Sequence, residues 1–560
     1  MRLGDWASPP KQLTMGLPQG SPLSPVLYNV YTKGLADLHQ NHICKVLTLA
    51  DDGLLYHTCR DSQEAAERVQ AQLDNAAQWC QETSSRINPE KAQALWCTLD
   101  NKAAGKPMPD VRFNDVVIDR TNQLRYLGVH FDRMLTFRGH VESLQLKCRK
   151  GLSVIKAMAA KGIEQRHLFR LYQGITLSVI DYGLGLTTLS QTNLQKLDRI
   201  QNEAMRVILG TTKDTPIEAM RYILDLPPTK TRQTVEQVKA YLKAAENPNN
   251  PLHGAVKEPK GDRLKRGKSW MGQAEDTISQ VCQLSDLRDT KEWENQPHQL
   301  RHFYQVVASD HLGRHCRDWA SGSTDAEIRI IIEENTKPHD LIIYTDGSVC
   351  REKGKSGWAF TAKENGKTIH EDSAAYEHVT SSLTMEVEAV THALQWLETH
   401  TFQTVTHAMI LTDSMNVIQK IKAGMGSPDW HNAMTNLDIR KLLWVYCPGH
   451  AGVKGNDRAD QLAGKAIITT GLRLGRSDVL RAVRQHLQQL EDNQEHHHSV
   501  DRLLERDIQK GSGRLSTLRG RERAVVNQTN IGTVSKSTLG KLLKGGEERI
   551  WAFPGAVIPT

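Results

Sequence analysis

The stretch Leu341-Ile342-Ile343-Tyr344-Thr345-Asp346-Gly347-Ser348 decides the fold of this chain. Its first part is an apolar, β-rich run, which is typical of a strand in the middle of a sheet. The run ends in a carboxylate, so the sequence predicts an acid at the end of a central strand. An Asp-Gly pair alone is a common turn signal, and its meaning depends on the residues around it.

The residues that follow alternate compactly between strands and helices. A second strand begins near Trp358, and apolar side chains then recur at helical spacing between Ser381 and His400. This spacing predicts an amphipathic helix that packs one face on the sheet. Glu386 lies beside the apolar stripe and is expected to point toward the sheet, whereas Glu388 is expected to be solvated.

Two later strands also lead into polar residues. The first ends in Asp413, which is followed by Ser414 and a helix. The second, at residues 441–446, runs into a glycine-flanked loop with His450, and the next helix carries Asp460. Two acids, Asp346 and Asp413, are therefore predicted to follow strands of one small α/β segment. Glu386 and Asp460 are predicted to lie on its helices.

The four acids of this unit are Asp346, Glu386, Asp413 and Asp460. Like charges that gather in a core are costly unless something neutralises them. Oxygen-only ligands suit magnesium or manganese rather than zinc. Two such ions about 3.5–4 Å apart can activate a water molecule and stabilise the leaving oxygen in phosphodiester cleavage. Each acid alone could be a helix cap or a turn residue, so the prediction rests on the ordered set.

This ordered set resembles ribonuclease H. The motifs that match in order and spacing are Thr345-Asp346-Gly347-Ser348, Met385-Glu386, Thr412-Asp413-Ser414, Gly449-His450-Ala451-Gly452, Asn456 and Asp460-x-Leu462-Ala463. The resemblance covers residues 338–470 and implies a metal-dependent nuclease that cuts the RNA strand of an RNA–DNA hybrid. A transposase or integrase of similar fold is the alternative, and the His450 loop and the Asp-Gly-Ser strand end argue against it.

The resemblance also implies roles for single residues. The ligands of two Mg²⁺ or Mn²⁺ ions would be Asp346, Glu386, Asp413 and Asp460, with Asp346 bridging the ions. His450 would shuttle a proton or help to release product. The residues placed to contact the hybrid are Gly347, Ser348, Ser414 and Asn456. The 2′-hydroxyl would distinguish the RNA strand from DNA.

The N-terminal part of the chain has a different pattern. A segment dense in Gly, Pro and Ser, residues 16–25, is followed by apolar residues at helical spacing. Two apolar strands then flank Asp51 and Asp52, which predicts a hairpin. The turn alone could be a plain structural one. The sharper interpretation is a carboxylate pair that holds metal ions for nucleotidyl transfer.

These motifs resemble reverse transcriptases of non-long-terminal-repeat retrotransposons. A ribonuclease H domain after the polymerase is similar to elements of the I or jockey-like kind. The resemblance makes Asp51 and Asp52 catalytic metal ligands and places Gln19, Gly20 and Lys91 beside template and nucleotide. The stretches that carry the resemblance are residues 16–25, 50–52, 88–91 and 126–132. An RNA template and a DNA primer would be partners of a full-length form.

Only fifteen residues precede Gly16, which is too few for the fingers region and the first catalytic Asp of that family. We therefore expect no RNA-directed DNA polymerase activity from this chain alone, and incorporation in a primer-extension assay on an RNA template would contradict this. Two alternatives to an active ribonuclease H remain. One is a polymerase fragment that is active only in a longer form, and the other is a non-enzymatic nucleic-acid-binding relic. The complete acidic set favours the nuclease over the relic.

The predicted fold class is α/β within a multidomain α+β chain. The expected parts are a partial reverse transcriptase palm over 1–135, a helical thumb or connection over 136–245, a linker or connection over 246–335, a ribonuclease H domain with a mixed five-stranded sheet over 338–470, and a polar, partly disordered tail over 471–560.

The composition sets outer limits on function. The chain has 560 residues, a formal net charge of +7 and a pI near 8.8, which is compatible with a nucleic-acid partner. No apolar run is long enough to cross a bilayer, and no protein partner is indicated. Nine cysteines without a Cys-x-x-Cys pair suggest reduced thiols. The expected location is intracellular, in cytoplasm or nucleus.

Overall fold

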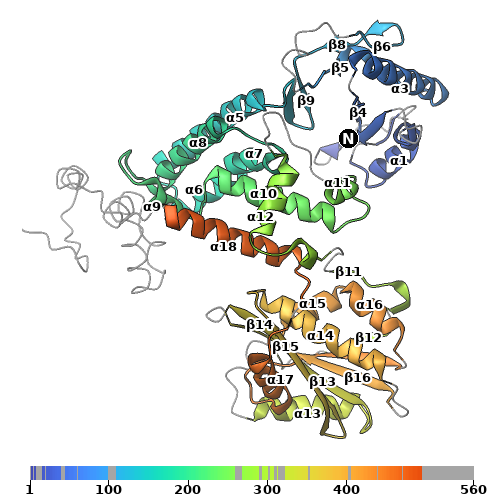
Figure 1. Cartoon of the computed structure of the whole chain (residues 1–560), viewed down its shortest axis with the longest axis vertical. Coiled ribbons are helices and arrows are strands. Elements are labelled where there is room, and N and C mark those ends of the chain that lie inside the picture. The colour runs from blue at the N-terminus through green and yellow to red at the C-terminus, as the bar shows by residue number, and fades with distance from the viewer. Residues whose placement is uncertain are drawn as a thin grey trace, which may run out of the picture. The chain divides into compact units, whose positions relative to one another are not determined.

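The structure of the chain is a computed structural model, drawn in Figure 1. It describes residues 2–3, 6–7, 16–18, 20–38, 44–59, 61–98, 109–258, 268–288, 293–300, 303–307, 312, 322–350, 354–400, 405–437, 439–469 and 471–494. The chain divides into two compact units. The first contains residues 1–183, 187–208 and 263–267, and the second contains residues 184–186, 209–262 and 268–560.

The first unit begins with short strands and hairpins and ends in long helices. Its elements are β1 (Arg2–Leu3), β2 (Trp6–Ala7), α1 (Ser24–Tyr31), α2 (Lys33–Asp37), β3 (Lys45–Leu49), β4 (Asp52–Tyr56), α3 (Ser62–Glu82), η2 (Pro89–Lys91), β5 (Gln93–Ala94), β6 (Arg112–Phe113), β7 (Val116–Val117), β8 (Asp119–Arg120), β9 (Gln123–Tyr126), β10 (Val129–Asp132), α5 (Arg138–Ala160), α6 (Gln165–Tyr172), η3 (Gln173–Leu177), α7 (Ser178–Asp181) and α8 (Gln191–Leu209). The predicted hairpin is confirmed, because β3 and β4 pair antiparallel with Leu49 opposite Asp52.

The second unit holds one large sheet and the helices around it. Its elements are η4 (Leu184–Leu186), α9 (Ile217–Leu224), α10 (Thr229–Ala245), α11 (His253–Lys257), α12 (Trp270–Ser279), η6 (Leu284–Asp286), β11 (Glu294–Asn295), η7 (His298–Leu300), β12 (Tyr304–Val307), α13 (Ser323–Asn335), β13 (Leu341–Cys350), β14 (Lys355–Glu364), β15 (Lys367–Tyr376), α14 (Ser382–Thr399), β16 (His407–Thr412), α15 (Met415–Lys422), β17 (Met425–Gly426), α16 (Pro428–Thr435), β18 (Lys441–Tyr446), α17 (Lys454–Lys465) and α18 (Arg476–Gln494).

The sheet of the second unit has the strand order β12-β18-β16-β13-β14-β15. The strands β13, β14 and β15 form an antiparallel meander, and β16, β18 and β12 add in parallel on the other side of β13. The predicted mixed α/β sheet is confirmed with one more strand than the five expected. The additional strand, β12, comes from the stretch predicted as linker or connection, where its short run of β-forming residues stands among polar ones.

Both faces of the sheet are covered by helices, and the strand alternation decides which side chains go where. On one face Leu341 and Ile343 pack into a core that includes buried residues of α14, α15 and α16. On the other face Tyr344 packs in a second core with residues of α13 and α17. The strand β13 therefore lies buried between two helical layers (Figure 1), as its apolar sequence predicts.

The stretch after the ribonuclease-H-like segment continues as a helix, α18. Its residues Val479, Leu480 and Val483 join the same core as buried side chains of α10 and α12. Residues 495–560, the rest of the predicted tail, lie outside the described part of the chain. Among the described residues, every helix is too short or too polar to span a bilayer.

Candidate metal and active site

The first candidate acid, Asp346, lies within the central strand of the sheet and not at its end as predicted, because pairing with β14 continues β13 to Cys350. The strand β13 is hydrogen-bonded to β14 on one side and to β16 on the other, so its backbone is fixed from both sides. Asp346 is buried, with 6% of its surface exposed. A Cβ atom on the next residue, Gly347, would lie 2.4 Å from the backbone nitrogen of Glu386. The glycine therefore allows α14 to cross directly against the strand.

The second candidate acid, Glu386, is brought to the strand by the start of helix α14. The side chain of Ser381 caps this helix and accepts a hydrogen bond of 2.9 Å from the backbone nitrogen of Thr384. Glu386 is 3% exposed, and the Thr412 hydroxyl donates to its Oε2 atom over 3.3 Å. The prediction that Glu386 points toward the sheet is confirmed.

The third acid follows the neighbouring parallel strand. Because Thr345 of β13 pairs with Thr412 of β16, the next residues, Asp346 within β13 and Asp413 after the end of β16, lie at the same level of the sheet. Carboxylate oxygens of Asp346, Glu386 and Asp413 all lie within 4.8 Å of one another. Three of the four predicted metal ligands therefore form one cluster.

Electrostatics sets two of these acids, Asp346 and Glu386, apart from ordinary carboxylates. Burial, and then the charges of Asp413 and Asp460, raise the pKa of Asp346 to about 8. Burial, and then the charges of Asp413 and Asp346, raise the pKa of Glu386 well above its usual value. Such shifts arise when buried like charges have no cation beside them. A divalent cation would replace these protons, so the oxygen-only donor set fits a metal of the magnesium class.

The fourth acid and the predicted histidine lie on the neighbouring helix and loop. The charge of Asp460 on α17 contributes to the raised pKa of Asp346. The Nδ1 atom of His450 lies 3.6 Å from Oδ2 of Asp460, and the His450 side chain is 83% exposed. The bidentate contact of Arg458 with Glu371 on β15, at 2.9 and 2.7 Å, fixes this end of α17. The histidine therefore lies beside Asp460 and remains accessible to a ligand.

The loop before His450 leaves room for the third acid. A Cβ atom on Gly449 would lie 2.5 Å from Oδ2 of Asp413. Any side chain at this position would displace that carboxylate. By contrast, a Cβ atom on Gly464 of α17 would meet nothing within 4 Å.

The residues predicted to contact the hybrid differ in their exposure. Gly347, Ser348 and Ser414 are partly exposed beside the acids. Asn456 is only 2% exposed, and its Oδ1 atom is buried without a hydrogen-bond partner among the described residues. The serines are therefore accessible as the structure stands, whereas Asn456 lies in the first turn of α17 beneath the surface.

The prediction that Glu388 is solvated is wrong. Glu388 is 9% exposed, and its Oε1 atom accepts a hydrogen bond of 3.0 Å from Arg288. Arg288 also lies 3.7 Å from Asp429. The arginine comes from a segment a hundred residues upstream. Sequence reasoning missed it because helical periodicity considers one helix and says nothing of a distant cation.

A second contact from outside the compact segment reaches α14. Asp478 of α18 is buried, and its carboxylate accepts hydrogen bonds from the Ser381 backbone nitrogen at 2.8 Å and the Thr384 hydroxyl at 2.6 Å. Helix α14, which carries Glu386, therefore contacts Arg288 from a segment before residues 338–470 and Asp478 from a segment after them. No motif in the sequence indicates either contact.

The predicted polymerase residues lie in the first unit. Asp51 and Asp52 are exposed at the turn of the β3–β4 hairpin, where Ala50 has a positive φ of 52°. Burial, and then the charge of Asp52, raise the pKa of Tyr126 on β9. Gly20 and Lys91 are exposed, and Gln19 lies outside the described residues.

Comparison with known proteins agrees with this geometry. The family described as "RNase H" matches residues 338–468, and the family described as "Reverse transcriptase (RNA-dependent DNA polymerase)" matches residues 3–131. Ribonuclease H of Francisella philomiragia is 30% identical over 149 residues, which cover 24% of this chain and 93% of that enzyme. The chain belongs to the ribonuclease H family. The match to this family covers the segment with the acidic cluster.

Further relatives place the ribonuclease H domain in its context. The RNA-directed DNA polymerase from mobile element jockey of Drosophila funebris is 29% identical over 210 residues, which cover 36% of this chain and 22% of that protein. The crystal structure of LC11-RNase H1 in complex with RNA/DNA hybrid is similar at 25% identity over 23% of this chain and 96% of that chain, with a TM-score of 0.19. The two family matches and the jockey relative confirm the resemblance to a non-long-terminal-repeat retrotransposon pol protein.

The chain spans only 22–24% of the length of the four transposon polymerases that it matches. Both matched families are families of enzymes, one of hydrolases and the other of nucleotidyltransferases. The ribonuclease H domain is the part for which the structure gives a buried acidic cluster.

Proposed function

We propose that the ribonuclease H domain hydrolyses the RNA strand of RNA–DNA hybrids with two divalent ions, Mg²⁺ or Mn²⁺. The observation that carries the proposal is the buried cluster of Asp346, Glu386 and Asp413, whose oxygens lie within 4.8 Å of one another. Two of these carboxyls have raised pKa values because burial and mutual repulsion disfavour their charge. Protein cores tolerate such a group when a cation neutralises it.

Asp346, Glu386, Asp413 and Asp460 are the residues that would hold the ions, with Asp346 as the shared ligand. When bound, such ions activate water and stabilise the leaving oxygen of a phosphodiester. The chain's own residues orient the reaction. Gly449 leaves space for Asp413, and His450 is exposed beside Asp460, where it can take up or deliver a proton near the scissile phosphate.

The substrate is proposed from the family and from the residues at the rim of the cluster. Ser348 and Ser414 offer hydroxyl groups beside the acids, at positions that can contact a nucleic-acid backbone. Recognition of the 2′-hydroxyl, which is both donor and acceptor, would restrict cleavage to the RNA strand. The first unit, with Asp51 and Asp52, would act on an RNA template and DNA primer in a longer protein.

Cleavage of a strand-labelled RNA–DNA hybrid by the purified chain tests this proposal. With magnesium we expect cleavage of the RNA strand alone. Asp413→Asn and Gly449→Ala should each lower the rate by at least about 100-fold, because one removes a ligand and the other displaces it. Both variants should keep the circular dichroism spectrum of the unchanged chain.

Two matched substitutions serve as controls. Gly464→Ala is the control for Gly449→Ala, because a Cβ atom on Gly464 would meet nothing within 4 Å. Asp372→Asn is the control for Asp413→Asn, because it removes an exposed carboxylate of β15. Both should leave the cleavage rate within about twofold, since such surface changes are usually small. A folded chain that leaves the hybrid intact with either magnesium or manganese would show that the domain is a binding relic.

A further inference from the structure

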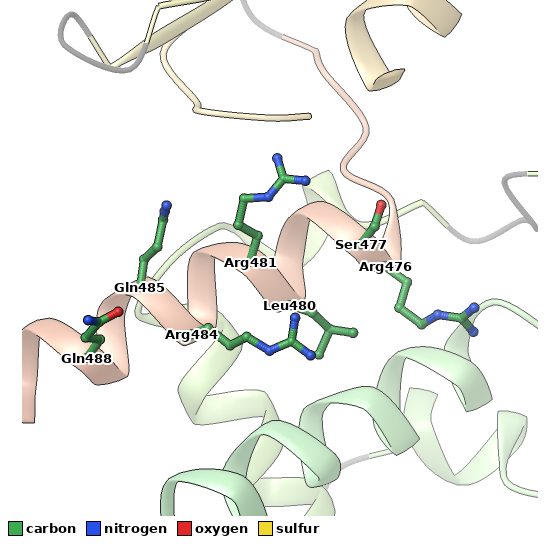
Figure 2. A pocket seen from close by; sticks show the side chains of 7 residues that line it. All are labelled: Arg476, Ser477, Leu480, Arg481, Arg484, Gln485 and Gln488. Atoms are coloured by element: carbon green, nitrogen blue, oxygen red, sulfur yellow. The ribbon is translucent and has the colours of Figure 1, made fainter. Parts of the chain in front are cut away.

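Helix α18 presents a polar, basic face after the ribonuclease H domain. A hollow of about 450 Å³ on this helix is lined by Arg476, Ser477, Leu480, Arg481, Arg484, Gln485 and Gln488. Figure 2 shows that all seven side chains come from this one helix, with Arg481 and Gln485 extending from the same side of it. Ser477, Arg481, Gln485 and Gln488 follow one another at helical spacing. At 1.5 Å per residue this row is about 16 Å long.

The positive charge of this face is only partly neutralised. Arg476 pairs with Glu246 at 3.2 Å. Arg481 lies 3.8 Å from Asp478, whose carboxylate is buried and already accepts two hydrogen bonds from the start of α14. Arg484 is exposed and forms no ion pair with any residue in the described part of the chain. Two guanidinium groups therefore remain available to an anionic ligand.

The chemistry of the face favours nucleic acid over an acidic protein. Protein interfaces have an apolar centre, whereas the lining here contains a single apolar residue, Leu480, which is 8% exposed. Interfaces with nucleic acid are more polar and more positively charged. Their phosphate contacts come mainly from Arg and Lys and also from Ser and Gln, the side chains found here. A row about 16 Å long matches roughly five nucleotides of one strand at about 3.4 Å each.

We propose that this face of α18 binds the phosphate backbone of nucleic acid, as a contact separate from the acidic cluster. In the setting of the proposed function, that nucleic acid is the hybrid beyond the cleaved bond. This binding site rests on the proposed function for its ligand, but it is tested by measuring hybrid binding and not cleavage. The contact is sequence-independent, because phosphate groups carry no base information.

The test measures binding of the full chain to a labelled hybrid of about 20 base pairs, with Asp413→Asn present throughout to prevent cleavage. We expect Arg481→Gln/Arg484→Gln to raise the dissociation constant about tenfold at about 100 mM salt. The slope of log affinity against log salt should fall by about 1.8, since each lost phosphate contact removes about 0.9. Arg481→Lys/Arg484→Lys should restore most of the slope because it keeps both charges.

The matched control is Arg329→Gln/Arg440→Gln, which removes the same charge from exposed positions on α13 and before β18. The hybrid affinity of this control variant and its salt dependence should stay close to those of the chain that carries Asp413→Asn alone. If the two double variants lose affinity equally, or if the α18 variant loses none, the site on α18 does not exist. The two proposals can fail separately. If the unchanged chain does not cleave the hybrid, but only Arg481→Gln/Arg484→Gln weakens hybrid binding, the proposed nuclease activity is refuted and the binding site on α18 is retained.

Discussion

Asp346→Asn is expected to abolish ribonuclease activity and, at the same time, to stabilise the metal-free domain at pH values above about 4. The activity falls because the variant loses a charged ligand of the cluster, and we expect a loss of at least about 1000-fold. The stability rises because an asparagine of nearly the same shape does not ionise. A loss of activity together with a gain of stability distinguishes an acid that serves function from one that serves the fold.

The pH dependence of this effect follows from the direction of the pKa shift. Burial and the neighbouring acids raise the pKa of Asp346 from 3.8 to about 8, so the folded metal-free protein holds this proton more tightly than the unfolded chain. The stabilising contribution is fully present below about pH 4 and is lost as the pH rises through about 8. Between about pH 4 and about pH 8, the free energy of unfolding falls by at most about 1.4 kcal/mol per pH unit because of this group.

Thermal unfolding at pH 4, 6 and 8 in a chelator, followed by circular dichroism, measures this effect. The melting temperature of Asp346→Asn should exceed that of the unchanged chain at pH 8, by about 2–4 °C per kcal/mol, and the difference should vanish near pH 4. Magnesium should raise the melting temperature of the unchanged chain more than that of the variant. A variant that is less stable at every pH would mean that Asp346 has a structural partner and no metal.

Arg288→Met is expected to destabilise the ribonuclease H domain, although Arg288 lies outside the residues that match the family. The side chains of Arg288 and Glu388 are 9% and 11% exposed and form a buried ion pair at 3.0 Å. Removing one partner of such a pair leaves an uncompensated buried charge, which costs about 3–5 kcal/mol. Because Glu386 lies two residues before Glu388 on α14, the magnesium concentration for half-maximal activity should also rise.

The double variant Arg288→Met/Glu388→Gln distinguishes this charge effect from a simple packing defect. Removing both charges should recover most of the lost stability in chemical denaturation, because no buried charge is then left alone. The matched control is Arg329→Met, whose ion pair with Asp325 has an arginine that is 61% exposed. That change should cost less than about 1 kcal/mol. If the double variant is as unstable as Arg288→Met, the ion pair is not the source of the effect.

The sequence predicts the α/β sheet and the acidic cluster well because both depend on local patterns. An apolar run that leads into Asp346 indicates a central strand, and a helix with Glu386 beside its apolar stripe places that acid on the sheet. The parallel pairing of β13 with β16 then brings Asp413 to the same level. Each step uses periodicity or strand order, which a single chain reveals.

The sequence fails where a side chain's environment is made by a distant segment. Glu388 has polar neighbours one turn along its helix, but Arg288 covers it from a segment predicted as linker or connection. Asp478 caps α14 from the stretch predicted as a tail. The strand β12 has only four residues, and its pairing with β18 cannot be recognised without the sheet. All three are long-range contacts that no local pattern encodes.

The pairing of β12 with β18 also bears on where the ribonuclease H domain can be separated from the rest of the chain. A recombination event, or an expression fragment, that begins at residue 338 would leave behind β12 and would bare the hydrogen-bonding edge of β18. That strand is apolar along Leu442, Leu443, Trp444 and Val445, all of them buried. A bare apolar edge is a template for pairing with other chains. A fragment in which this edge of β18 stays paired therefore has to begin before Tyr304 and not at residue 338.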